Sequence, residues 1–371
     1  MHLFYLLFGV EIVIAITAFT NVAEYTFMPV KERTENFLSD DRLNLYLIFS
    51  LCVIFIFHAF KNPFTLEDIP YYAWAFDEAQ QISWSRVVSI GYDNLKTETG
   101  FALIVKLFSS IFHTSQVLFI LTSAFIISAV FFAVKKYSPI FWLSVIVFII
   151  DSFPQSLFML RAFIAVGIYL FAFPAIINRK LFVYLLLALL AFSVHMSSIL
   201  FFPVYFLYGL KNWRYLLFMM IAIAVVLITG FRIFLPLVVE YVIPDYAYYI
   251  INENQYEGAS WKMPALLSAI LLFRALVMRE HFFETGINRL LSVVMMIAVI
   301  IYTAGIGFGL TSRMALFYTN MTFLILPNTI QYIKSSSLQF ACAVIYILFN
   351  GYFYFKSASD MLWANYQLVQ I

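Results

Sequence analysis

Long runs of apolar residues, separated by polar connectors, constrain the fold of this chain more than any other feature. A helix of about 20 such residues crosses the hydrocarbon core of a bilayer. Only 11% of the residues are charged, whereas soluble domains average about 25%, so the chain lacks the polar surface of a water-soluble globule. The apolar runs lie at about 3–23, 43–60, 116–134, 138–151, 157–177, 181–195, 197–210, 215–235, 263–279, 289–309, 313–333 and 337–355.

These runs predict an all-α polytopic membrane protein with about 12 transmembrane helices. We expect a single integral membrane domain over residues 1–371. The net charge of +2 is too small to favour nucleic acid as a partner. Cys52 and Cys342 both lie inside apolar runs, where a cysteine usually acts as a small hydrophobic residue. With no Gly-rich nucleotide motif and no Cys or His cluster in the sequence, we expect neither a metal site nor a cofactor.

The charge pattern predicts which loops face outward, because Lys and Arg collect on the cytoplasmic side. Short basic connectors lie at 135–136, 179–180, 211–214, 279–289 and 334. They agree with one another only if every second connection is cytoplasmic, which places 61–99 (outer loop 1) and 236–262 (outer loop 2) outside. The segment 101–112 is too short to span and carries Lys106. We interpret it as a re-entrant or interfacial helix on the outer face.

Ionisable groups near membrane depth cost a few kcal/mol on insertion scales, so each usually has a partner or a function. Arg161 lies about one turn inside the outer end of its predicted span, and Arg313 opens a late span at the outer face. Two guanidinium groups there, one at a helix N-terminus, favour a doubly anionic ligand. The alternative for Arg161 is an ion pair with an acidic residue of another helix, or snorkelling to the headgroups.

His195 lies where one apolar run gives way to the next. An imidazole titrates near neutrality, so at a membrane edge it can accept a proton from a sugar hydroxyl. The alternative is a helix-end histidine that bonds a backbone carbonyl.

Both outer loops interleave acidic and aromatic residues, a mixture typical of sugar-binding sites. The alternative is an aromatic belt at the membrane interface, which is enriched whatever the function. The candidate glycan-binding residues are Asp68, Tyr72 and Glu98 in outer loop 1, and Asp245, Tyr246 and Tyr249 in outer loop 2.

Five short motifs follow one another in a set order: EDIPYYAWAF, ETGFALIVKLF, LRAFIAVGIYL, VHMSSILFFPVYFLY and TSRMALFYTNMTFLILP. In this order the chain, from about residue 45 to 355, resembles the EpsG-like and Wzy-like polymerases of bacterial surface polysaccharides. The resemblance implies a GT-C-related glycosyltransferase of the bacterial plasma membrane that lengthens O-antigen, capsule or exopolysaccharide. Its active site would face the periplasm or exterior, and it would use no nucleotide sugar and no metal. Its partners would be undecaprenyl-diphosphate-linked glycans, the lipid bilayer, and a chain-length regulator and flippase of the same pathway.

The resemblance also implies roles for particular residues. Arg161 and Arg313 match arginines that hold the diphosphate, His195 matches a His-x-Ser motif, and Glu98 and Asp68 match acidic outer positions. We therefore expect the two arginines to stabilise the leaving diphosphate. His195, or failing that Glu98 or Asp68, would accept the proton of the attacking hydroxyl.

The chain departs from the family pattern at three positions. Ala162 stands where the family often has Gln, Lys61 where it has Arg, and Thr99 where it has Pro. These departures weaken the match to the family most at Lys61, and they weaken the assignment of Arg161 least.

Two rival functions follow from the same features. A transporter or flippase for the lipid-linked glycan would show inverted repeats and charges near the midplane. An O-antigen ligase would use much the same arginine and histidine chemistry, so the residues alone do not separate it from a polymerase.

Overall fold

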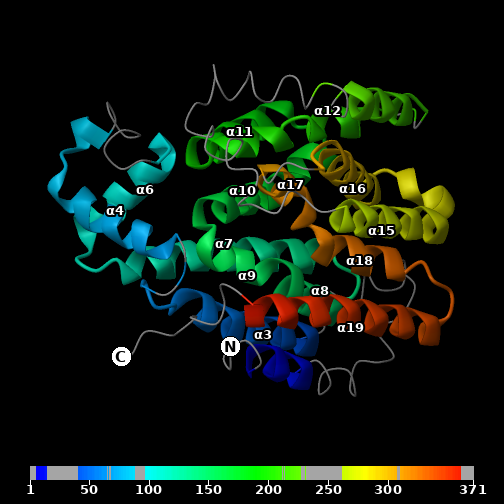
Figure 1. The fold of residues 1–371 in the computed structure, drawn as a ribbon, viewed down its shortest axis with the longest axis horizontal. Coiled ribbons are helices and arrows are strands. Elements are labelled where there is room, and N and C mark those ends of the chain that lie inside the picture. The colour runs from blue at the N-terminus through cyan, green and yellow to red at the C-terminus, as the bar shows by residue number, and fades with distance from the viewer. Residues whose placement is uncertain are drawn as a thin grey trace. The chain divides into compact units, whose positions relative to one another are not determined.

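The computed structural model describes residues 6–14, 41–64, 66, 68–87, 97–210, 212, 214–226, 230, 261–306 and 310–360, without the side chains of 41–44, 310–313 and 354–360. Its regular elements within these ranges are helices, which confirms the all-α class (Figure 1). The chain divides into two compact units. Unit 1 is Met1–Phe173, Leu185–Ser198 and Thr322–Ile371, and unit 2 is Pro174–Tyr184 and Ile199–Met321.

Unit 1 contains the helices α3 (Asp41–Ala59), α4 (Ile69–Gln81), α6 (Thr99–Ile111), α7 (Gln116–Tyr137), α8 (Phe141–Val147), η1 (Phe148–Ser152), α9 (Phe153–Phe158), α18 (Thr322–Ile330) and α19 (Ser336–Asp360), and most of α10 (Leu160–Ile177) and α11 (Leu181–Val194). Unit 2 contains α12 (Val204–Gly209), α15 (Lys262–Met278), η4 (Arg279–Phe283), α16 (Ile287–Ala304) and α17 (Leu310–Thr319), and part of η2 (Met196–Phe201).

Within the described residues, five helices are long and apolar enough to cross a membrane, so the chain is a multi-pass membrane protein. They are Gln116–Tyr137, Phe141–Phe158, Leu160–Ile177, Ile287–Ala304 and Ser336–Phe353. Shorter apolar helices occur at Leu45–Ala59, Thr99–Ile111, Leu181–Val194, Met196–Tyr208 and Arg214–Val226. The total of about 12 spans stays a prediction.

The second of these spans runs past the predicted end of its apolar run at Asp151. The structure continues the helix through α8, η1 and α9, with Asp151 inside it. Tyr346 of α19 donates a hydrogen bond to Asp151 Oδ2 at 2.6 Å, which supplies the partner that a carboxyl group inside a span requires. A π-helical turn, closed by Phe153 N–H to the carbonyl of Phe148, precedes Pro154, whose missing N–H would interrupt an α-helix.

The predicted single run at 313–333 is also broken, since α17 and α18 are separate helices. Within α18, Pro327 lacks the N–H that would bond the carbonyl of Phe323, four residues earlier. The hydroxyl of Ser144 in α8 donates to that carbonyl instead, at 2.7 Å. A helix-breaking residue inside a span is thereby compensated by a hydroxyl of a neighbouring helix.

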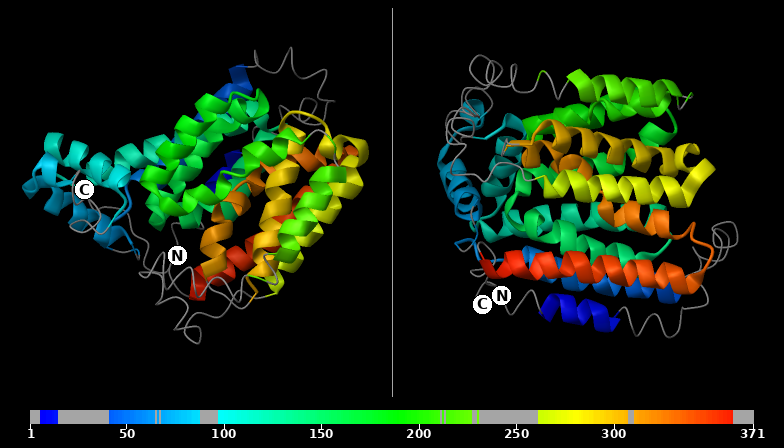
Figure 2. Two further views of the ribbon diagram at one scale, coloured as in Figure 1. Left: turned by 90° about the horizontal axis from the view of Figure 1, so that it is seen from above. Right: turned by 45° about the vertical axis from the view of Figure 1, so that its right-hand side comes forward.

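The short helices α4 and α6 lie side by side in both views of Figure 2. Lys106 of α6 is buried there and donates to the carbonyl of Ala79, in the last turn of α4, at 2.8 Å. The 13 residues of α6 extend about 20 Å, less than the roughly 30 Å of a hydrocarbon core. The predicted short helix at 101–112 is therefore present, and its placement at the membrane interface stays a prediction.

Unit 2 contains a buried arginine within the apolar run predicted at 263–279. Arg274 of α15 is fully buried, and its Nε donates to Ser292 Oγ of α16 at 3.0 Å. Its Nη2 donates to the carbonyl of Asn288, also at 3.0 Å. Because it donates to a hydroxyl and a carbonyl oxygen of α16, Arg274 links α15 to α16.

The Asp151–Tyr346 contact gives a test of packing within unit 1. The change Tyr346→Phe removes the donor and should lower the free energy of unfolding by about 1–3 kcal/mol, because the partly buried carboxyl group inside the span loses this bond. The double variant Asp151→Leu/Tyr346→Phe removes both polar groups and should regain most of that loss. The measurement is unfolding in detergent, and a Tyr346→Phe protein as stable as the wild type would contradict the pairing.

Candidate functional site

Three helices of unit 1 bring Glu98, Arg161 and His195 together at their ends. Glu98 Oε2 accepts a hydrogen bond from Arg161 Nη1. The second oxygen, Oε1, pairs with His195 Nδ1 at 3.1 Å and accepts the Met196 N–H at 3.1 Å. Arg161 Nη1 also donates to Thr97 Oγ1 at 3.1 Å. One carboxylate therefore joins a guanidinium, an imidazole and a backbone amide.

Local backbone structure explains why these groups converge. Glu98 is the N-cap of α6, with φ −61° and ψ 144°, and its side chain makes no capping bond to its own helix. The carboxylate is thus available to other helices. Arg161 lies in the first turn of α10, which is separated from α9 by the single residue Met159. His195 directly follows α11, and the Met196 N–H is one of the unpaired donors that open the helix η2.

A glycine lets α6 approach α11 closely enough for these contacts. A Cβ atom at Gly100 would lie 2.4 Å from Ser193 Oγ, 2.6 Å from the Ser193 carbonyl oxygen and 2.7 Å from its carbon. A side chain at this position therefore meets backbone that cannot move aside cheaply. The Glu-x-Gly motif thus has a steric meaning, because Gly100 permits the approach through which Glu98 reaches His195.

The site is partly open, and its charges are strongly coupled. The side chains of Glu98, Arg161 and His195 are 13%, 23% and 17% exposed. Burial would raise the pKa of Glu98, but the hydrogen bond from His195 and the charge of Arg161 outweigh it and lower that pKa to about 2. Glu98 is therefore ionised at neutral pH, so it is a poor proton acceptor but a firm anchor for the Arg161 guanidinium and the His195 imidazole.

Helix α4 lies next to this site and presents Tyr72 to it. The Tyr72 ring lies 5.9 Å from Arg161 Cζ and packs edge-on against Phe101, with ring centroids 5.4 Å apart. Tyr72 is 2% exposed, so its ring supports Arg161 and offers no open face for a sugar. Burial raises the pKa of Tyr72, which keeps its hydroxyl protonated. Asp68, the exposed N-cap of α4, lies one turn before Tyr72.

The remaining predicted residues are not placed at this site. Arg313 lies in α17 of unit 2, and its side chain is outside the part that the structure describes. Asp245, Tyr246 and Tyr249 lie outside the described residues, as does most of outer loop 2. For metal binding, the described residues contain no group of three or more His, Cys, Asp or Glu side chains that could hold an ion.

Comparison with known families decides the classification. The EpsG family model matches residues 43–368, nearly the whole chain. The chain belongs to the EpsG family. No curated protein and no solved structure matches it. Membership in the EpsG family, together with the apolar helices, supports a role in polysaccharide biosynthesis at a membrane.

In this EpsG family member, the sequence identified Glu98, Arg161 and His195 but not how they combine. The interpretation of Arg161 as one half of an ion pair with another helix agrees with the structure, because Glu98 is that partner. Sequence reasoning missed Thr97 and the Met196 N–H, which complete the hydrogen bonds around Glu98 and Arg161. Thr97 carries no signal beyond its place next to Glu98, and a backbone donor carries none.

The glycine contact predicts a steric effect. Gly100→Ala should push α6 off α11 and cost about 1–3 kcal/mol of unfolding free energy, as overpacking does. Gly351→Ala is the matched control, because a Cβ there meets open space within a helix. Adding Ser193→Ala should not rescue Gly100→Ala, since the carbonyl contact persists. The measurement is thermal unfolding in detergent, and equal melting of the two glycine variants would refute the steric role.

The depressed pKa of Glu98 predicts how stability depends on pH. A carboxyl with a lowered folded-state pKa stabilises the protein fully above its ordinary value, and this contribution is lost as the pH falls through the folded value. The window therefore runs from pH 4.5 down to about 2, and the contribution is at most about 3 kcal/mol. The free energy of unfolding of the wild type should fall across this pH range, and that of Glu98→Gln should not show this loss. The same dependence on pH in both proteins would contradict the prediction.

Proposed function

We propose that this protein polymerises undecaprenyl-diphosphate-linked oligosaccharide repeat units into a surface polysaccharide, either O-antigen, capsule or exopolysaccharide. The observation that carries the proposal is the Glu98 carboxylate that holds Arg161 and His195 side by side at helix ends. The fixed cation of Arg161 can stabilise an anionic leaving group, and the oriented imidazole of His195 can accept a proton. EpsG family membership supports the same reaction class.

In the proposed reaction, the acceptor hydroxyl oxygen bonds to the anomeric carbon of the donor sugar as the bond from that carbon to the phosphate oxygen breaks. Undecaprenyl diphosphate departs with the electron pair. The hydroxyl proton passes to His195. With Nδ1–H donating to Glu98, the imidazole carries its lone pair on Nε2, and the ionised carboxylate stabilises the imidazolium that forms.

Arg161 takes the diphosphate in this proposal, and the assignment of Arg313 to the same role rests on the sequence alone. A guanidinium has five N–H donors, and the hydrogen bonds of Arg161 to Glu98 and Thr97 use Nη1. Its Nε is buried without a hydrogen-bond partner among the described residues. The side chains of Arg161 and Tyr72 also form a hydrogen bond, so the proposal assigns the remaining donors of the fork to phosphate oxygens, where they offset the charge that develops on the leaving group. The proposal assigns this role to arginines of a GT-C-like site and needs no metal.

The direction of the helices supports an outward-facing site. Lys135 and Lys136 end α7, and Arg179 and Lys180 follow the far end of α10. Arg161 lies in the first turn of α10, so it lies at the membrane face opposite that basic end. Since basic ends face the cytoplasm, we assign the site to the outer face of the plasma membrane.

The test replaces Arg161 and His195 singly, at matched membrane levels, and follows lipid-linked glycans and polymer on a gel. His195→Ala should slow polymerisation by about 10²–10⁴-fold, as loss of a general base does. Arg161→Lys should also fail, because lysine lacks the fork that meets carboxylate and phosphate together. His281→Ala is a matched control, since His281 pairs with Glu284 at 3.0 Å on an exposed surface.

Purified protein with a defined lipid-linked repeat unit separates the rival functions. A ladder of products supports the polymerase. A product that forms only with a second acceptor indicates a ligase, and translocation without new bonds indicates a transporter. If Arg161→Lys and His195→Ala make as much long polymer as the wild type, the roles proposed for Arg161 and His195 are wrong.

A further inference from the structure

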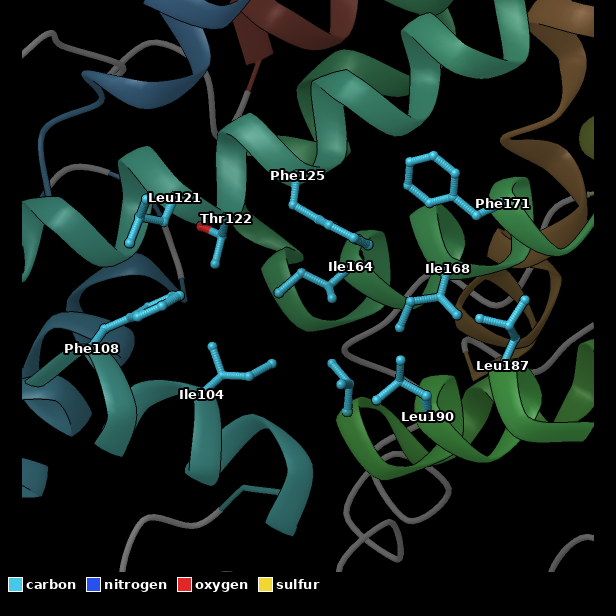
Figure 3. Close-up of a pocket in the computed structure, with 11 residues that line it drawn as sticks. Ile104, Phe108, Leu121, Thr122, Phe125, Ile164, Ile168, Phe171, Leu187 and Leu190 are labelled. Carbon is cyan, nitrogen blue, oxygen red and sulfur yellow. The ribbon is translucent and has the colours of Figure 1, made fainter. Parts of the chain in front are cut away.

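An apolar groove lies within unit 1, next to the polar site. Its volume is about 270 Å³, and four helices line it: α6, α7, α10 and α11. Figure 3 shows side chains from all four converging on one space. Ile164 and Ile168 of α10 are buried, whereas Leu190 of α11 is 51% exposed, so the groove has a buried floor and an open rim.

The groove wall offers a ligand almost no polar group. Thr122 of α7 is the polar residue in its lining, and its hydroxyl already donates to the carbonyl of Leu118 at 2.6 Å. The other lining side chains are Ile, Leu, Phe and Val. The groove therefore suits a hydrocarbon chain and not a sugar or a phosphate.

The groove begins where the polar site ends. Val194, which lines it, directly precedes His195, and Ile164 lies one helical turn after Arg161. On α6, Ile104 lines it less than two turns after Glu98. A ligand that places an anion at Arg161 can therefore extend a chain from that anion straight into the groove.

We propose that this groove holds the head-proximal part of the single polyisoprenoid chain of the donor lipid. The inference rests on the proposed function, because it names the part of the substrate that lies beyond the diphosphate. The groove lies directly next to Arg161, so it fits a lipid whose single hydrocarbon chain is bonded directly to its diphosphate. A glycerophospholipid instead brings two chains and a glycerol between chain and phosphate.

The size of the groove limits how much of the chain it takes. Along α10 the lining runs from Ile164 to Phe171, about 10 Å at 1.5 Å per residue, against roughly 30 Å of hydrocarbon core. The rest of a long chain therefore stays in the bilayer. Because lipid is as apolar as the groove, close packing and not the hydrophobic effect selects the chain.

A glycine sets the shape of the groove wall. A Cβ atom at Gly167 of α10 would lie 2.9 Å from Cε1 of the Phe125 ring, which lines the groove. Gly167→Ala must therefore displace that ring. Phe125 also contacts Phe171, another lining residue, with ring centroids 5.8 Å apart, so the change alters the wall at two points without adding a polar group.

The test compares two adjacent leucines of α11. Leu190 lines the groove and is 51% exposed, whereas Leu189 is 65% exposed and does not line it. Binding of farnesyl diphosphate, undecaprenyl diphosphate and inorganic diphosphate is measured on the full-length protein in nanodiscs. Leu190→Trp should weaken both prenyl diphosphates about tenfold, since on the order of ten carbon contacts are lost. It should leave inorganic diphosphate unchanged, and Leu189→Trp should change none of the three.

Gly167→Ala provides a second variant should Leu190→Trp fail to fold, with the same loss expected for the prenyl probes alone. Since the groove takes only the start of the chain, farnesyl and undecaprenyl diphosphate should bind the wild type within a few-fold of each other. Equal binding of the prenyl probes to wild type, Leu190→Trp and Gly167→Ala would overturn the proposal.

The two proposals fail in different ways. If Leu190→Trp makes polymer at the wild-type rate while Arg161→Lys makes none, the groove assignment is wrong and the proposed function stands. If the prenyl probes depend on Leu190 but defined repeat units are never joined, the groove assignment stands and the polymerase function is wrong.

Discussion

The carboxylate of Glu98 is the contact on which the described part of the site depends. It bonds Arg161, His195 and the Met196 N–H, so it ties the start of α6 to the start of α10 and the end of α11. The hydrogen bond from His195 and the charge of Arg161 outweigh the desolvation of this carboxylate, so its ionised form stabilises the fold. Its second contribution is positional. It fixes the guanidinium and the imidazole relative to each other and orients both ring nitrogens of the histidine.

The same physical constraint governs several other polar groups of the described helices. A polar atom in hydrocarbon needs a partner from protein, and the described residues supply such partners across helices. Asp151 receives the Tyr346 hydroxyl, the carbonyl left unpaired by Pro327 receives Ser144, and Arg274 meets Ser292. His58 links three helices through Ser123 and Ser156. These hydrogen bonds help to fix the positions of neighbouring helices. Apolar contact alone favours no particular arrangement strongly, since lipid competes for the same apolar surface.

The site and the groove divide the proposed substrate between two kinds of surface. The polar end, at Arg161 and His195, suits the diphosphate and the reacting sugar, and the apolar groove suits the chain. Both share the same helices, α6, α10 and α11. The missing side chains of two glycines shape these helices. Gly100 lets α6 lie close to α11, and Gly167 leaves room for the Phe125 ring in the groove wall. In the proposed reaction, a chain anchored in this way would orient the anomeric carbon toward the imidazole.

The sequence by itself determined the all-α membrane class and the family, and it singled out the three residues that the structure brings together, because apolar runs and rare charges are local features of the chain. It predicted helix boundaries poorly in two apolar runs. Asp151 lies inside a span because Tyr346, far along the chain, supplies the partner that its carboxyl group requires, and the run at 313–333 is divided between α17 and α18. Only the tertiary structure decided that Glu98 joins Arg161 to His195, 63 and 97 residues away. It also decided that Tyr72 supports the arginine from a buried position and that four helices enclose an apolar groove. Those properties arise from distances between helices, and a sequence pattern carries no information on such distances until the helices are packed.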